Sequence, residues 1–158
     1  MFKFAIHFLV LAVFFTSTSC QEHIRIPSRY LIPEGYVGWI RIDFLVAGAP
    51  ALAIEDNHYL FKIPSSGRLE TLSDPEYGWS SDDDYYLYSG DTRRALNNDG
   101  SRGQMIHNAF TGWIGDNFEH RIATYEYFFI GTKDDYGKYG DAKDENHQPK
   151  VGPVFKLK

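Results

Sequence analysis

Cysteine is almost missing from this chain, which has a single Cys, Cys20, in 158 residues. A disulfide scaffold or a Cys-ligated zinc site needs several cysteines, so both classes are excluded. An excess of basic residues is also missing, because 16 Lys and Arg stand against 21 Asp and Glu, for a net charge of -5. Proteins that bind nucleic acids generally use clustered basic residues to neutralise phosphates. We therefore expect no nucleic-acid partner.

Long apolar runs are lacking except for one, at residues 4–15, which only His7 interrupts. Twelve helical residues span about 18 Å, well short of the roughly 30 Å of a bilayer's hydrocarbon core. Lys3 precedes the run and small residues follow it, which is typical of a secretory signal peptide. We assign residues 1–19 to that signal and leave them out of the fold.

The segment that ends the signal, Ser17-Thr18-Ser19-Cys20, resembles a bacterial lipoprotein box. In such a box the Cys thiol receives diacylglycerol, the signal is cut just before it, and the new amine is acylated, commonly with palmitate. The segment departs from the usual pattern because Ser17 stands where the box has Leu. An ordinary signal peptidase, which would release a soluble protein, is the alternative.

We favour lipidation of Cys20, because a free thiol at the N-terminus outside the cytoplasm would be exposed to oxidation. The membrane is then a partner through the lipid anchor. Gln21, rather than Asp, follows the Cys, which favours the outer membrane if the source has two membranes. On this interpretation residues 20–28 hold the lipidated Cys and a short tether, and residues 29–158 form one domain.

Helical periodicity is scarce after the signal, whereas the full sequence has 16% aromatic residues, 14 Gly and 7 Pro. The clearest strand is 37–46, where Ile40, Ile42 and Phe44 alternate with polar residues. Further strands are predicted at 58–63, 85–88, 121–130 and 151–157, with residues 29–32 beginning the fold. Segment 68–72 is expected to pair with 58–63 as a hairpin, 104–113 fits a strand or a helix, and 132–150 is expected to be a polar loop.

Segment 125–130 is apolar on both faces, as expected of a central strand between two layers. The pattern as a whole predicts an all-β fold, a β-sandwich of about seven short, mostly antiparallel strands with long polar loops.

Three segments, 32–39 (IPEGYVGW), 59–67 (YLFKIPSSG) and 127–132 (YFFIGT), resemble an uncharacterised family of bacterial exported proteins and lipoproteins. That resemblance implies no established activity and no catalytic residues. The first two segments are also similar to prealbumin-like sandwich modules, which supports the architecture only.

Two sets of residues are candidates for binding. Trp79, Tyr77, Tyr85 and Tyr86 form a candidate aromatic platform for a carbohydrate, peptide or protein, although aromatic residues more often fill a core. Asp82, Asp83 and Asp84 are candidate oxygen ligands for calcium, although acidic loops are usually only solvated.

No Gly-x-Ser-x-Gly motif occurs in the chain, so no nucleophile elbow indicates a hydrolase. The leading hypothesis is an uncharacterised lipoprotein of the cell envelope that binds an envelope protein or peptide, for example as an immunity or inhibitor protein. The alternatives are a small envelope hydrolase and a calcium-binding surface module.

Overall fold

The computed structural model describes residues 25–77, 80, 82–96, 105–116 and 120–157. Within these residues the chain forms ten strands and one short helix, which confirms the predicted all-β class. The elements are β1 (Ser28–Pro33), β2 (Gly38–Phe44), β3 (Ala53–Glu55), β4 (His58–Lys62), β5 (Arg68–Glu70), β6 (Asp84–Ser89), β7 (Thr92–Ala95), β8 (Met105–Gly115), β9 (Arg121–Gly131), α1 (Lys133–Tyr139) and β10 (Gly152–Pro153).

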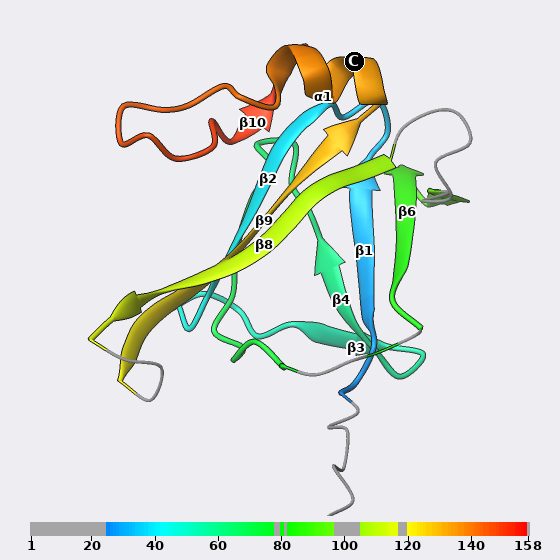
Figure 1. Ribbon diagram of the computed structural model, residues 1–158. Helices are drawn as coiled ribbons and strands as arrows, with labels where there is room; N and C mark the ends of the chain where they lie inside the picture. The colour runs from blue at the N-terminus through cyan, green and yellow to red at the C-terminus, as the bar shows by residue number, and fades with distance from the viewer. Residues whose placement is uncertain (1–24, 78–79, 81, 97–104, 117–119, 158) are drawn as a thin grey trace, which may run out of the picture.

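The strands form two sheets that face each other (Figure 1). The first sheet has the order β3-β4-β1-β6-β7, and the second has the order β10-β2-β9-β8, with β5 alongside β2. Most neighbours are antiparallel, but β1 runs parallel to β4 and to β6. The ambiguous segment 104–113 belongs to strand β8, and the closing strand predicted over 151–157 is limited to the short β10.

The predicted hairpin between 58–63 and 68–72 is wrong, because β5 pairs in parallel with β2 of the other sheet. The turn between β4 and β5 explains the change of sheet. Gly67 has a φ of +79°, and a Cβ there would lie 1.9 Å from the Tyr36 hydroxyl, so only glycine fits. The Gly67 carbonyl accepts a hydrogen bond from the Arg41 amide at 2.9 Å, which directs the chain to β2.

The main core lies between the two sheets. As the alternation predicted, Ile40, Ile42 and Phe44 of β2 face inward and are buried. They pack with buried side chains of the opposite sheet, including Tyr30, Ile32, Phe61 and Leu87. The residues between them on β2 face outward, and this second face is also covered.

Trp39, Tyr127 and Phe129 form a second buried cluster on the outer face of β2 and β9. The expectation of a polar loop over 132–150 is wrong at its start, because helix α1 covers this cluster. Thr132 and Asp135 form a capping box, in which the Asp135 amide donates to the Thr132 hydroxyl at 3.1 Å and the Thr132 amide donates to the Asp135 carboxylate at 2.9 Å. The Trp39 indole donates to the Gly140 carbonyl at 2.9 Å and holds the end of the helix over the cluster.

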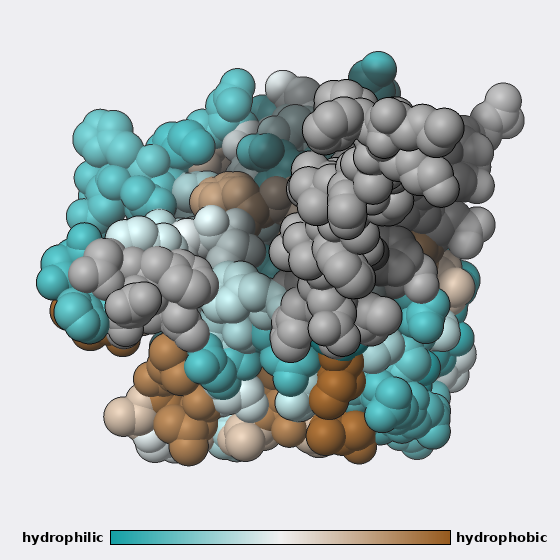
Figure 2. Space-filling model, turned by 60° about the horizontal axis from the view of Figure 1, so that its bottom comes forward, coloured by the Kyte–Doolittle hydropathy of each residue, from teal (hydrophilic) through white to brown (hydrophobic). Residues whose placement is uncertain are grey.

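The described chain begins at Arg25, at the end of the sandwich opposite α1 and β10 (Figure 1). We call this end the tether end. The far part of the β8–β9 hairpin extends from the body toward the same end. Figure 2 shows this end coming forward, with hydrophobic residues along the lower border of the view. None of the described helices has the length and apolar character needed to cross a membrane.

Candidate functional site

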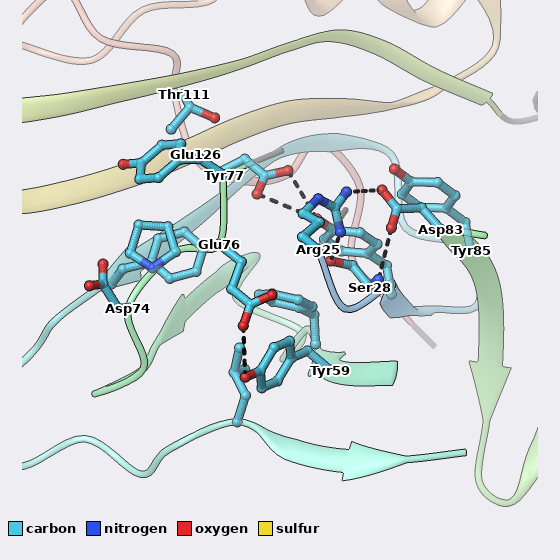
Figure 3. Close-up of a pocket in the computed structure, with 15 residues that line it drawn as sticks. Arg25, Ser28, Tyr59, Asp74, Glu76, Tyr77, Asp83, Tyr85, Thr111 and Glu126 are labelled. Carbon is cyan, nitrogen blue, oxygen red and sulfur yellow. Dashed lines mark hydrogen bonds and ion pairs between the residues drawn. The ribbon is translucent and has the colours of Figure 1, made fainter. Parts of the chain in front are cut away.

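A cavity of about 270 Å³ opens between the two sheets at the tether end (Figure 3). Strands β1, β4 and β6 form one wall, β9 and β8 form the other, and the segment 74–77 lies across the opening. Its polar lining residues are Arg25, Ser28, Tyr30, Tyr59, Asp74, Glu76, Tyr77, Asp83, Tyr85, Thr111 and Glu126. Four of these are acids and one is a base, so the lining carries an excess of negative charge.

Glu126 supplies the most deeply placed charge of the site. Strand register puts it beside Ile42 of β2 and Thr111 of β8, so the three side chains share the face of the sheet that borders the cavity, with Ile42 buried and Thr111 exposed. The Tyr30 hydroxyl donates to both carboxylate oxygens, at 3.3 and 3.4 Å. Burial raises the pKa of the Glu126 carboxyl to about 7, against the opposing effects of the Tyr30 hydrogen bond and the positive charge of Arg25.

The first described residues of the chain form part of the site. The Arg25 guanidinium makes an ion pair with Asp83, and it also donates to the Ser28 hydroxyl at 3.1 Å. The Asp83 carboxylate accepts in addition from the Ser28 amide at 2.8 Å. The Ile26 amide donates to the Glu76 carboxylate at 3.1 Å. The tether is therefore bonded to the wall and the rim of the cavity before β1 begins.

Tyrosine rings make up the apolar part of the lining. Tyr30 stacks on Tyr85 with ring centroids 4.7 Å apart and on Phe61 at 4.8 Å. Burial raises the pKa values of Tyr30 and Tyr85, so both hydroxyls remain neutral donors at physiological pH. Across the opening, the Tyr59 hydroxyl donates to the Glu76 carboxylate at 3.1 Å, as Figure 3 shows.

The aromatic residues predicted to bind are only partly brought together. Tyr77 and Tyr85 both line the cavity. Tyr86, the next residue on β6, points to the other face of the sheet, where its ring lies 5.8 Å from the Arg29 guanidinium. Trp79 lies outside the described residues, as does Cys20.

The three aspartates predicted to hold calcium point in different directions. Asp83 faces the cavity and pairs with Arg25, whereas Asp84 receives two hydrogen bonds from Arg29 near 3.1 Å on the opposite face. Asp82 is exposed. The described residues contain no group of three His, Cys, Asp or Glu side chains that could hold a metal ion. Calcium binding at Asp82, Asp83 and Asp84 stays a prediction.

Neither Glu126 nor Arg25 was among the residues predicted to bind. One signal for Glu126 was present, because it is the only acid in the aromatic segment 125–130 and shares a face with Phe128. No comparable signal marked Arg25, whose partner Asp83 lies 58 residues away along the chain. Chemically, the cavity offers hydrogen-bond acceptors, neutral tyrosine hydroxyls and stacking faces, the elements of a site for a polar ligand.

Comparisons with known proteins agree with this fold. Residues 25–139 match the model of a family of unknown function, DUF6843. A crystal structure of a candidate lipoprotein from Bacillus anthracis is similar, with a TM-score of 0.57 and 21% sequence identity over 78% of this chain and 84% of that one. At this identity the likeness concerns the fold. A search of curated proteins finds no match.

Proposed function

Because the chain belongs to the DUF6843 family, whose function is unknown, we propose its role from the site: a lipid-anchored binding protein of the cell envelope. In this proposal Cys20 carries the lipid, and the cavity at the tether end receives the bound partner. The partner is an envelope protein or peptide, or a small ligand of similar chemistry.

The position of Cys20 relative to the sandwich carries the anchor proposal. The described residues begin at Arg25, which pairs with Asp83, and only four residues lie between Arg25 and the sole cysteine in the sequence. In the sequence Cys20 thus comes shortly before the first described strand and directly after the predicted cleavage point, as lipid attachment requires. The Bacillus anthracis protein, described as a candidate lipoprotein, supports the same placement.

The chemistry of the cavity supports binding as its role. Its acids are engaged with donors of the protein itself, as in Asp83 with Arg25 and Glu76 with Tyr59. The Ser28 hydroxyl accepts from Arg25, a permanently charged group that cannot act as the general base of a hydrolase. Preformed polar contacts of this kind favour recognition of a ligand that exchanges hydrogen bonds with the wall.

Metabolic labelling with an alkyne analogue of palmitate tests the anchor. Wild-type protein should take up the label and sediment with membranes, and Cys20→Ser should do neither. Ser28→Ala is a matched control, because it lies in the domain and should keep the label. Unlabelled wild-type protein in the soluble fraction would refute the proposal.

A further inference from the structure

The pairing of β9 with β2 ends at Thr124, and the far part of the β8–β9 hairpin beyond it, residues 113–116 and 120–123, projects from the sandwich; we call it the arm (Figure 1). It exposes three large apolar side chains, with exposed fractions of 40% for Trp113, 55% for Ile114 and 78% for Ile122. Apolar groups of this size on one projecting element are costly in water and indicate a surface that covers them.

The register of the arm restricts what that covering surface can be. Trp113 lies opposite Thr124 and Ile114 lies opposite Ala123, so Trp113 and Ile114 point to opposite faces. Ile122 precedes Ala123 and shares the face of Trp113. A strand added at the free edge of β8 would leave both faces in water. A lipid interface that surrounds the tip would cover both.

The length of the tether places the arm near such an interface. This step rests on the proposed lipid anchor at Cys20. The five residue steps from Cys20 to Arg25 span at most about 18 Å when fully extended. The tether cannot lengthen by releasing β1 without breaking the bonds of Arg25 and Ser28 to Asp83. The tether end, toward which the arm extends, is therefore held close to the membrane surface.

Charge at the tether end is offset in part: the cavity lining keeps an excess of acids, and the exposed Asp116 of the arm lies 3.5 Å from His120. Asp83 is paired with Arg25, and Arg29 pairs with both Asp56 and Asp84. Several of the carboxylates that anionic lipids would repel are therefore offset by guanidinium groups of the same end. Trp113 is of the residue type that favours the boundary between headgroups and acyl chains.

We propose that the arm enters the headgroup region of the membrane to which the protein is anchored, with Trp113, Ile114 and Ile122 in contact with lipid. The anchor and the arm then make two separated contacts, which fix the orientation of the domain and turn the opening of the cavity toward the membrane surface.

A fluorescent reporter on the arm tests the proposal in the full-length lipoprotein. Cys20 is the sole cysteine and its thiol is blocked once lipidated, so Ile122→Cys provides one site for an environment-sensitive thiol dye. Val154→Cys, next to β10 at the opposite end of the sandwich, is the matched control. Both are reconstituted in phosphatidylethanolamine–phosphatidylglycerol vesicles.

The dye at position 122 should brighten about threefold or more on transfer to the interface, and nitroxide lipids should quench it. The dye at position 154 should behave as in water. An aqueous signal at both positions in lipidated protein would overturn the arm proposal and leave the anchor intact. Brightening that grows with the protein-to-lipid ratio would also overturn it, because a second copy would then cover the arm. Dye uptake by the wild-type chain would show a free Cys20 thiol and refute the anchor itself.

Discussion

The Glu126 carboxyl lies at the inner face of β9, where burial raises its pKa to about 7 from an ordinary value of 4.5. Between these two pH values the unfolded chain has lost this proton and the folded chain still holds it. The free energy of unfolding should therefore fall as pH rises through this window and level off above pH 7.

Glu126→Gln keeps the shape of the side chain and removes its ionisation. We expect the variant to be about 3 kcal/mol more stable than wild type at pH 8 and nearly equal to it at pH 4. Urea denaturation at the two pH values measures the difference. Glu70→Gln, which replaces an exposed carboxyl of β5, is the control and should keep the wild-type pH profile. Persistence of the full pH dependence in Glu126→Gln would assign it to another group.

The position of Glu126 could be predicted only in part from the alternation of apolar and polar residues. Alternation along 121–130 placed Glu126 on the face of Phe128, but a polar residue on that face could equally have lain at a solvated strand end. Its burial depends on Tyr30, which lies 96 residues away along the chain. Such a contact has no local signal.

At the scale of the element, Arg29 joins β1 to its neighbour β6 on one side and to β3, which lies beyond β4, on the other. Its guanidinium contacts Asp84 of β6 at 3.0 Å, Glu55 of β3 at 3.1 Å and Asp56 at 3.0 Å, with 12% of the side chain exposed. Strands far apart along the chain are thus held by one side chain. Removing it takes from Asp84, whose side chain is 27% exposed, its guanidinium partner and leaves Glu55 with Arg93 alone.

Arg29→Met keeps the aliphatic length and removes the charge, and we expect it to cost about 3 kcal/mol of stability. Arg94→Met is the matched control, because the Arg94 side chain is 62% exposed and makes an ion pair with the Glu34 carboxylate at 2.8 Å. Its cost should stay within about 0.5 kcal/mol. Chemical denaturation measures both, and equal costs would contradict the bridging role.

The positions of several strands could be predicted from the sequence, whereas the pairing of β5 could not. Two-residue alternation located the strands at 37–46, 58–63 and 121–130, because side-chain direction is a local property of an extended chain. It did not identify the partner of β5, since the choice between β4 and β2 depends on the contact of Gly67 with Tyr36. Helix α1 has only seven residues, too few to be stable alone, and the buried Trp39 indole donates to the carbonyl of Gly140 at its end. Its stability therefore comes from the cluster beneath it.

At the scale of the whole molecule, β2 and β9 each contribute side chains to both hydrophobic clusters, the core between the sheets and the outer cluster under α1. Phe128 of β9 belongs to the core between the sheets, and its neighbour Phe129 belongs to the cluster under α1. Loss of either cluster therefore removes packing from the backbone that supports the other. The domain should unfold as one cooperative unit.

Phe128→Leu and Phe129→Leu test this coupling. Each should lower the free energy of unfolding by on the order of 1–2 kcal/mol. Far-UV and near-UV circular dichroism should give coincident thermal transitions for wild type and for both variants. Separate transitions in Phe129→Leu would show that the outer cluster and α1 melt on their own.

Some features followed from the sequence alone, because each depends on residues close together in the chain. They are the all-β class, the inward face of β2, the apolar character of both faces of β9 and the predicted lipid-attachment residue. Only the tertiary structure decided the order of the strands. It also decided that Tyr77, Tyr85 and Asp83 line one cavity, and that Tyr86 and Asp84 lie away from it. The physical reason is that local periodicity fits several strand pairings equally well, and only contacts between distant segments decide among them. The cavity lies between two sheets, so it is defined only once the strands of both sheets are paired.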